Sequence, residues 1–353
     1  MQSLIYLDYN ATSPLRKEVK DAMFQVMGGP LNPSSIHASG RAARKLLEDA
    51  RAKVLKSVNA KNLVFCSSGT EANNIALAQG ENILVSAIEH DSVWKLKSSE
   101  FRVQNSGIID LDDIENQLSS LQSPIPVVLS VMFANNETGI IQPVKDVVAI
   151  ARKYGALIHC DAVQAYGKIP VDFADLGVDV MTISAHKIGG PVGAAALIFR
   201  DGLELKPIMK GGGQEKNKRP GTEDVVAIVG LGKLAEIIGF GRAVSRETWF
   251  EDELEKIGGK IVGKETPRLP NTTCVIHPNM EAATQLIALD MAGICVSSGS
   301  ACSSGKVEVS RTLKAMGIEK AKNAIRISTG WATSRSELET FLAEYKKNSK
   351  ANS

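Results

Sequence analysis

The sequence predicts an α/β protein: a large domain with a mostly parallel sheet of the seven-stranded type, covered by helices, and a smaller α+β C-terminal domain. Three observations lead to this fold. The chain has 353 residues, which is too long for one small core. Apolar runs with strand character alternate with helical patterns from about residue 63 to about residue 199, as in βαβ units. The pattern changes after about residue 240.

Strand patterns and helical patterns alternate in the first part of the chain. Helices are expected at 70–78 and 144–155, and a further helix from Asp224 to about Gly239 follows the sheet. The predicted strands lie in NLVFC (62–66), ENILVSA (81–87), PVVLSVMF (126–133), ALIHCDA (156–162), VDVMTISA (178–185) and AAALIFR (194–200). Ligands of open α/β sheets bind beyond the carboxyl ends of strands, so the residues after these runs are the functional candidates.

The rest of the chain has the pattern of a small α+β unit. Its runs are TTCVIH (272–277), EAATQLIALDMAG (281–293), AIRIST (324–329) and SRSELETFLAEYKK (334–347). We therefore predict three parts. Residues 1–15 form an N-terminal segment that packs on the small domain or the interface, residues 16–240 form the large domain, and residues 241–353 form the small domain.

Composition and charge give no sign of a nucleic-acid or membrane partner. The net charge is +2, and Lys and Arg are spread along the chain without a basic stripe. The N-terminus lacks the pattern of a signal peptide, and the apolar run Val225–Gly232 is far too short to span a bilayer. We expect a cytoplasmic protein.

The five cysteines form neither a disulfide framework nor a CxxC pair, so free thiols and no metal site are predicted. Cys66, Cys160, Cys274 and Cys295 lie in apolar runs and are expected to be buried. Cys302 lies in SSGSACSSGK, which buries little and predicts an exposed loop with a thiol available as a nucleophile.

Small residues follow the first strand. Ser68, Gly69 and Thr70 stand between a strand and a helix start, where free N–H groups and hydroxyls can hold a phosphate. A plain helix N-cap by Ser67, Ser68 or Thr70 is the alternative.

Two further strand ends carry a carboxylate and a lysine. Asp161 could pair with a protonated ring nitrogen, although a strand-end Asp often caps the next turn. Lys187 follows an apolar strand, and partial burial would make it a nucleophilic amine, with Ser184 and His186 as further phosphate donors. A solvated loop lysine is the common alternative. Gln164 stands three residues after Asp161.

Three more residues complete the predicted constellation. Asn136 could bind a ring oxygen or a substrate carboxylate, or form a turn. His90 could stack on an aromatic ring and move protons, although a lone histidine is often structural. Arg326 interrupts an apolar strand, which suits either a bidentate substrate carboxylate or a structural ion pair. A phosphate cup, an amine nucleophile and a ring-nitrogen partner together predict pyridoxal 5′-phosphate (PLP).

The sequence resembles the cysteine desulfurases, the NifS- and IscS-like branch of the class V aminotransferases with PLP fold type I. The resemblance runs from residue 6 to residue 330. Ser68 stands where the family usually has Gly, and the stretches around His90 and at 240–270 are short. The segments that carry the resemblance are YLDYNAT, NPSSIHASGRAA, SSGTEANN, EH, SVMFANNETGIIQPV, HCDAVQAYGK, SAHKIGGP, GGGQEKNKRPGTE, SSGSACSSG and AIRISTG.

The resemblance implies a role for each candidate. Lys187 would form the Schiff base with PLP, and Cys302 would attack the sulfur of L-cysteine and carry the resulting persulfide. His90 would stack on the ring and move protons. The other implied roles are phosphate binding by Gly69, Thr70, Ser184 and His186, ring contacts by Asp161 and Gln164, substrate-carboxylate binding by Asn136 and Arg326, and a contact of Thr222 with the phosphate of a neighbouring subunit.

The implied product is L-alanine, with the persulfide passed to a sulfur acceptor such as an iron–sulfur scaffold protein or a tRNA thiolation protein. Cys302 could contact an iron–sulfur cluster transiently, and the shared phosphate site implies a homodimer. Two alternatives remain open at this point. One is another PLP reaction on this fold, by an aminotransferase or a selenocysteine lyase, and the other is a non-catalytic scaffold for sulfur transfer.

Overall fold

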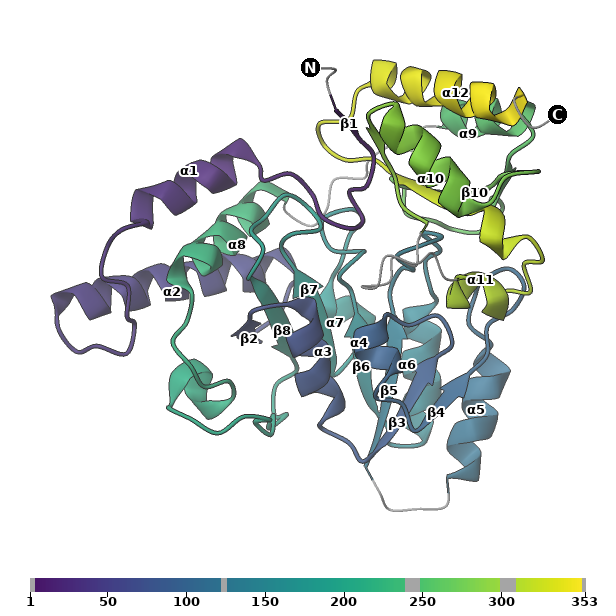
Figure 1. Cartoon of the computed structure of the whole chain (residues 1–353). Coiled ribbons are helices and arrows are strands. Elements are labelled where there is room, and N and C mark those ends of the chain that lie inside the picture. Colours follow the sequence, from purple (N-terminus) through teal and green to yellow (C-terminus); the bar gives the residue numbers. More distant parts are fainter. Residues whose placement is uncertain (1–3, 122–125, 239–247, 299–308, 351–353) are drawn as a thin grey trace.

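The computed structural model describes residues 4–121, 126–238, 248–298 and 309–350. A seven-stranded sheet flanked by helices forms the lower part of Figure 1, and a smaller unit lies above its right-hand half. The predicted α/β class is confirmed.

The large sheet is mostly parallel. Its order is β2-β8-β7-β6-β5-β3-β4, and only β8 runs antiparallel to its neighbours. The central strands are buried along their whole length, which explains why they are nearly uninterrupted apolar runs. The strands are β2 (Asn62–Cys66), β3 (Asn82–Ser86), β4 (Ser99–Phe101), β5 (Val127–Met132), β6 (Leu157–Asp161), β7 (Val180–Ser184) and β8 (Ala195–Phe199).

Helices flank this sheet. The long helix α2 (Ala38–Ser57) packs on α8 (Val225–Ile238), and α1 (Lys17–Val26) packs on α8 from the other side. The contact of α2 with α8 is close, since a Cβ at Gly232 would lie 2.7 Å from Ala50. The remaining helices of the large unit are α3 (Gly69–Leu77), α4 (Asp91–Trp94), α5 (Leu111–Ser120), α6 (Val144–Lys153) and α7 (Phe173–Leu176).

The smaller unit contains two short sheets. Strands β9 (Lys260–Ile261), β10 (Thr272–Ile276) and β12 (Ala324–Ser328) are antiparallel, and β1 (Ile5–Tyr6) pairs with β11 (Ile294–Cys295). The N-terminal segment therefore joins the sheets of the C-terminal part. Its helices are α9 (Thr248–Lys256), α10 (Ala282–Met291), α11 (Arg311–Ala315) and α12 (Arg335–Lys350).

Strand β10 connects the two units. Successive side chains of a strand point to opposite faces, so Val275 enters the core of the small unit while Cys274 and Ile276 enter the large core. The two units thus share packed surface. The boundaries at residues 15 and 240 stay predictions, and residues 239–247 lie outside the described ranges.

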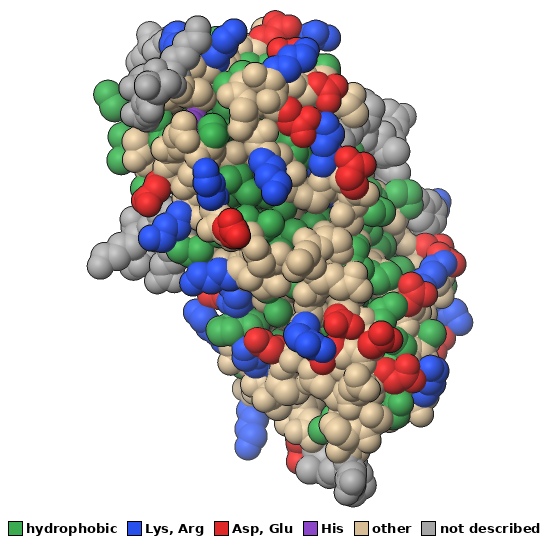
Figure 2. Space-filling view, turned by 90° about the vertical axis from the view of Figure 1, so that its right-hand side faces the viewer, with side chains coloured by type: hydrophobic (Ala, Val, Ile, Leu, Met, Phe, Trp, Pro, Cys, Tyr) green, Lys and Arg blue, Asp and Glu red, His purple; other side chains and the backbone are tan. Residues whose placement is uncertain are grey.

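The charged side chains are spread over the described surface, as the sequence predicts. Figure 2 shows Lys and Arg interspersed with Asp and Glu over one face. Cys66, Cys160 and Cys274 are buried as predicted, whereas Cys295 is only half-buried because β11 is a short strand at the edge. None of the described helices is long and apolar enough to cross a membrane.

Candidate active site

The strand ends that carry candidate residues meet at one edge of the large sheet. Asp161 is paired with Met132 on one side and with Thr182 on the other. Ser184, at the end of β7, and Cys66, at the end of β2, are both in register with Ala195. The sheet therefore brings the segments after β2, β5, β6 and β7 together.

The turn after β2, residues 68–70, is the predicted phosphate cup. Ser68 is the N-cap of α3, and its hydroxyl accepts a hydrogen bond from the backbone N–H of Glu71 at 3.1 Å. The predicted capping alternative is thus realised at Ser68. It leaves the cup intact, because Gly69 and Thr70 occupy the first helical positions, whose N–H groups have no carbonyl partner within the helix.

Close packing places this cup beside the other strand ends. A Cβ on Gly69 would lie 3.2 Å from Val163 Cγ2 and 3.8 Å from Ser184 Cβ. An alanine at this position would crowd the Val163 side chain, which would have to move by a few tenths of an ångström. Ser184 itself is buried.

Asp161 is a buried carboxylate held in a fixed orientation. Oδ1 accepts a hydrogen bond from the backbone N–H of Val163 at 3.0 Å, and Oδ2 accepts one from Asn73 Nδ2 at 2.8 Å. The first bond is the local turn contact expected of a strand-end Asp. No cationic side chain is paired with Asp161 in the described part of the chain, so a protonated ring nitrogen would supply its missing counter-charge.

His90 is connected to Asp161 through two polar side chains. Its Nδ1 lies 2.8 Å from Ser92 Oγ, and Ser92 Oγ accepts a hydrogen bond from Asn73 Nδ2 at 2.9 Å. His90 is also the N-cap of α4, and the residue is exposed. These contacts place the His90 ring in one hydrogen-bonded group with Ser92, Asn73 and Asp161. Stacking of this ring on a cofactor stays a prediction.

Lys187 is not a solvated loop lysine. Its Nζ donates to the backbone carbonyls of Asn10 at 2.9 Å and Ala11 at 2.7 Å. Burial and the positive charge of Arg326 lower the pKa of Lys187 to about 8. A substantial fraction is therefore the neutral, nucleophilic amine near neutral pH.

The N-terminal segment crosses the site. Besides the Lys187 contacts, Ser13 Oγ donates to the Lys187 carbonyl at 2.8 Å, and the Ser13 N–H donates to the His186 carbonyl at 2.7 Å. Asn10 is almost fully buried. Sequence reasoning placed residues 1–15 near the interface but assigned Asn10 no role.

His186 is a partly buried histidine next to Lys187. Burial, with the charge of Lys187, lowers the pKa of His186 to about 4. Its Nδ1 lies 3.3 Å from Thr12 Oγ1. A neutral imidazole keeps one N–H donor, so His186 could hold a phosphate oxygen by a hydrogen bond and not by charge.

Arg326 is a buried cation that already has one carboxylate. Nη2 contacts Asp8 Oδ1 at 2.6 Å, and Nη1 donates to the backbone carbonyl of Asn136 at 3.0 Å. The predicted pair of Asn136 and Arg326 is therefore in contact, through the main chain of Asn136. Nε of Arg326 is buried and has no partner in the described structure. The ion-pair alternative is realised, and N–H groups remain for a substrate carboxylate.

Gln164 lies on the same side of the site. Nε2 donates to the Asn10 carbonyl at 3.1 Å, and Oε1 accepts from Lys168 Nζ at 2.7 Å. Neither Lys168 nor Asn73 was singled out from the sequence. In the sequence these two residues are marked only by their spacing, three or four residues from a candidate residue in the same turn or helix.

Glu89 is a further residue that sequence reasoning missed. It is buried directly before His90, and its Oε1 accepts hydrogen bonds from Ser86 Oγ and from the Met132 N–H at 2.8 Å. Burial raises the pKa of Glu89 to about 8, so it is largely protonated at neutral pH.

Two predicted residues are not joined to this cluster. Cys302 lies outside the described residues. Thr222 is exposed, and within the described ranges it makes no hydrogen bond to the other candidates. Its neighbour Arg219 contacts Glu71 of α3 at 2.7 Å, so the RPGTE segment lies beside the cup.

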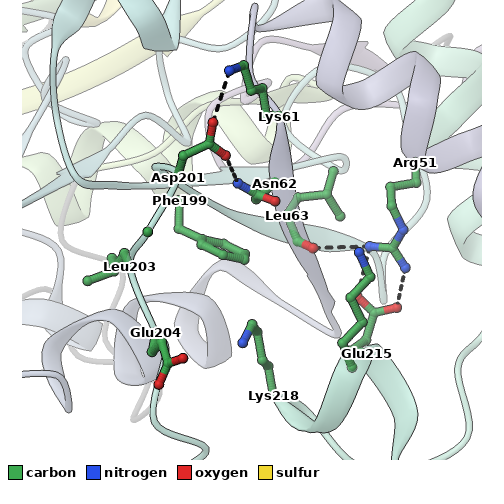
Figure 3. A pocket seen from close by; sticks show the side chains of 12 residues that line it. Arg51, Lys61, Asn62, Leu63, Phe199, Asp201, Leu203, Glu204, Glu215 and Lys218 are labelled. Carbon is green, nitrogen blue, oxygen red and sulfur yellow. Dashed lines mark hydrogen bonds and ion pairs between the residues drawn. The ribbon is translucent and has the colours of Figure 1, made fainter.

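A separate surface pocket of about 320 Å³ lies at the opposite edge of the sheet. Figure 3 shows two pairs among its charged side chains, Arg51 with Glu215 and Lys61 with Asp201. The Lys61–Asp201 pair joins the residue before β2 to the segment after β8, the Arg51–Glu215 pair joins α2 to the segment at 214–217, and the pocket has none of the candidate residues.

The residues at the strand ends fit PLP. A phosphate would meet the start of α3, the pyridine nitrogen would meet the uncompensated Asp161, and the aldehyde would meet the Lys187 amine. The backbone N–H groups at the start of α3 would be donors to the phosphate.

Comparisons with known proteins agree with this site. The family model for class V aminotransferases matches residues 5–341. Cysteine desulfurase IscS of Dictyoglomus turgidum is 39% identical, over 97% of this chain and 93% of that protein.

Two solved structures are also similar. The NifS-like protein of Rickettsia africae is 36% identical with a TM-score of 0.88, over 98% of this chain and 99% of that one. A structure of SspA in complex with cysteine is 27% identical with a TM-score of 0.77, over 92% of this chain and 98% of that one.

The fold and the lysine-centred site define a class V aminotransferase, and the chain belongs to that family. Within the family it belongs to the cysteine desulfurases of the IscS and NifS type.

Proposed function

We propose that this protein is a PLP-dependent cysteine desulfurase, which converts L-cysteine to L-alanine and retains the sulfur as a persulfide on Cys302. The observation that carries the proposal is the Lys187 amine, with its pKa lowered to about 8, in one site with Asp161 and Arg326. The curated relatives named cysteine desulfurase and the SspA structure with bound cysteine support L-cysteine as the substrate.

PLP, when bound, supplies an electron sink that stabilises negative charge at the substrate Cα. Asp161 would hold the ring nitrogen, Gln164 the ring oxygen, and Gly69, Thr70, Ser184 and His186 the phosphate. His90 would cover the ring.

The chain's own residues perform the remaining work. Arg326 and Asn136 orient the substrate carboxylate, and Lys187, as a neutral amine, removes the proton from Cα. His90 then takes part in proton transfer within the site. A buried guanidinium with N–H groups to spare favours a substrate that carries a carboxylate.

Cys302 supplies the second nucleophile. A bond forms between Cys302 Sγ and the substrate Sγ while the substrate Cβ–Sγ bond breaks, and the carbon skeleton takes up a proton and leaves as L-alanine. Transamination needs no such thiol. Cys302 lies outside the described residues, so this step rests on the SSGSACSSG segment.

A homodimer is part of the proposal. Exposed apolar side chains on and near α1, with Phe24 and Met27 each more than half exposed, would gain from being covered. Three consecutive residues, Glu215, Lys216 and Asn217, have left-handed φ of 46°, 56° and 64°. Such backbone strain is typical of functional segments, and the exposed Thr222 lies five residues further along the same segment.

The persulfide would pass to an acceptor, either an iron–sulfur scaffold protein or a tRNA thiolation protein. A cytoplasmic location, with reducing conditions for the free thiols, also belongs to the proposal.

Purified protein with L-cysteine and a thiol reductant tests the function. We expect a cofactor band at about 390–420 nm and equal amounts of alanine and sulfide. Aminotransferase activity would instead consume cysteine without alanine, and a scaffold would be colourless. Selenocysteine as a competing substrate distinguishes a selenocysteine lyase.

A further inference from the structure

Lys168 is a buried lysine beside the site that none of the proposed steps uses. It is 6% exposed, and its Nζ donates to Asn10 Oδ1 and to Gln164 Oε1, each at 2.7 Å. Both partners are neutral amides, and no carboxylate of the described residues forms an ion pair with it. Burial lowers the pKa of Lys168 well below its usual value.

These two contacts determine how the Gln164 amide is turned. Whether charged or neutral, the Lys168 amine has enough N–H groups to donate to both Asn10 Oδ1 and Gln164 Oε1, and the amide oxygen of Gln164 is the atom that faces it. Nε2 of Gln164 consequently points the other way. One of its N–H groups donates to the Asn10 carbonyl at 3.1 Å, and the second remains for the site.

The same lysine fixes Asn10. With Oδ1 held by Lys168, Nδ2 donates to Thr272 Oγ1 at 2.9 Å and to the Asn136 carbonyl at 3.2 Å. The backbone carbonyl of Asn10 in turn accepts from Lys187 Nζ at 2.9 Å. Lys168 is therefore in direct contact with Gln164, the predicted ring-oxygen ligand, and is separated from the Lys187 amine by Asn10 alone.

We propose that Lys168 is a positioning residue, which locks Gln164 as a hydrogen-bond donor toward the ring oxygen of the cofactor. The inference rests on the proposed function. An N–H donor stabilises the ionised ring oxygen. It therefore lowers the pKa of the proton that this oxygen shares with the Lys187 nitrogen. Lys168 thereby keeps Lys187 unprotonated, and the site ready for substrate, at a lower pH.

The test is a pH titration of the cofactor absorbance in holoenzyme without substrate. In Lys168→Met the Gln164 amide is free to turn its oxygen to the ring, and the midpoint of the absorbance change should rise by about one to two pH units. Lys168→Gln restores an N–H donor and should stay nearer to the wild type. Lys153→Met, at an exposed lysine paired with Glu115, is the matched control without a shift.

A Lys168→Met enzyme with a lower melting temperature and an unchanged midpoint would overturn the inference. Should that variant fail to fold, Gln164→Glu carries the test, because it keeps an acceptor for Lys168 and faces the ring with an acceptor. Its midpoint should rise equally, and an unchanged midpoint would again refute the proposal. A wild-type protein without any cofactor band would refute the proposed function instead.

Discussion

The Asp8 carboxylate and the Arg326 guanidinium form an ion pair with 2.6 Å between Oδ1 and Nη2. Asp8 belongs to the N-terminal segment and Arg326 to β12, 318 residues further along the chain. Because a buried arginine with one carboxylate keeps N–H groups for another, this pair can serve structure and substrate binding together.

Replacing Arg326 by Lys should weaken the binding of L-cysteine. Loss of the guanidinium removes a buried, hydrogen-bonded partner of the substrate carboxylate, so KM should rise by about 30-fold or more. Steady-state kinetics measures this, with Asp8→Asn as the control that keeps Arg326. A lower melting temperature with an unchanged KM would make Arg326 purely structural.

The lowered pKa of Lys187 predicts the pH dependence of cofactor capture. The neutral amine is the nucleophile, and at pH 8 about half of Lys187 is neutral, against about 0.3% for an unshifted lysine. Binding of PLP to the apoenzyme, followed by stopped-flow absorbance, should accelerate from pH 7 to 9 and then level off. A rate that still rises tenfold per pH unit at pH 10 would contradict this.

Asp161→Asn tests the ring-nitrogen partner. The amide keeps the shape and the local turn but cannot stabilise a protonated pyridine, so kcat should fall by about 10²–10³ while the cofactor stays bound. Asn73→Ala, which removes one hydrogen bond to Asp161, should have a smaller effect in the same direction. Equal kcat in Asp161→Asn and wild type would exclude this role.

The buried ion pair of Arg51 and Glu215, which lies away from the candidate active site, should contribute to the stability of the fold. The Glu215 carboxylate is buried and accepts from both Arg51 Nη atoms and from the Phe65 N–H. Arg51→Met should destabilise the protein by about 3–5 kcal/mol, as an unpaired buried charge remains. Lys45→Met, at the exposed pair with Asp49, should cost less than about 1 kcal/mol in the same urea titration.

Much of the sheet could be predicted because buried parallel strands are short apolar runs. The run predicted at 62–66 coincides with β2, and the run predicted at 178–185 contains β7. Short edge elements were missed. Strand β4, three residues of SEF, has no apolar pattern, and its place depends on pairing with β3.

Candidate residues could be predicted where a reactive side chain stands at or just after the end of a strand, as Asp161 and Lys187 do. They could not be predicted where a contact joins distant segments. Asn10 and Lys168 meet over 158 residues of sequence, and local pattern carries no information about such a contact. The Arg326 alternatives could be decided only by seeing Asp8 beside it.

A single turnover with L-cysteine in the absence of reductant tests the central claim, that a lysine and a thiol act in sequence. We predict one alanine per active site and one added sulfur atom on the peptide that contains Cys302, measured by mass spectrometry. Cys302→Ala should keep the cofactor band and form no alanine. Full alanine yield from Cys302→Ala, or sulfur on another cysteine in the wild type, would contradict the two-nucleophile mechanism.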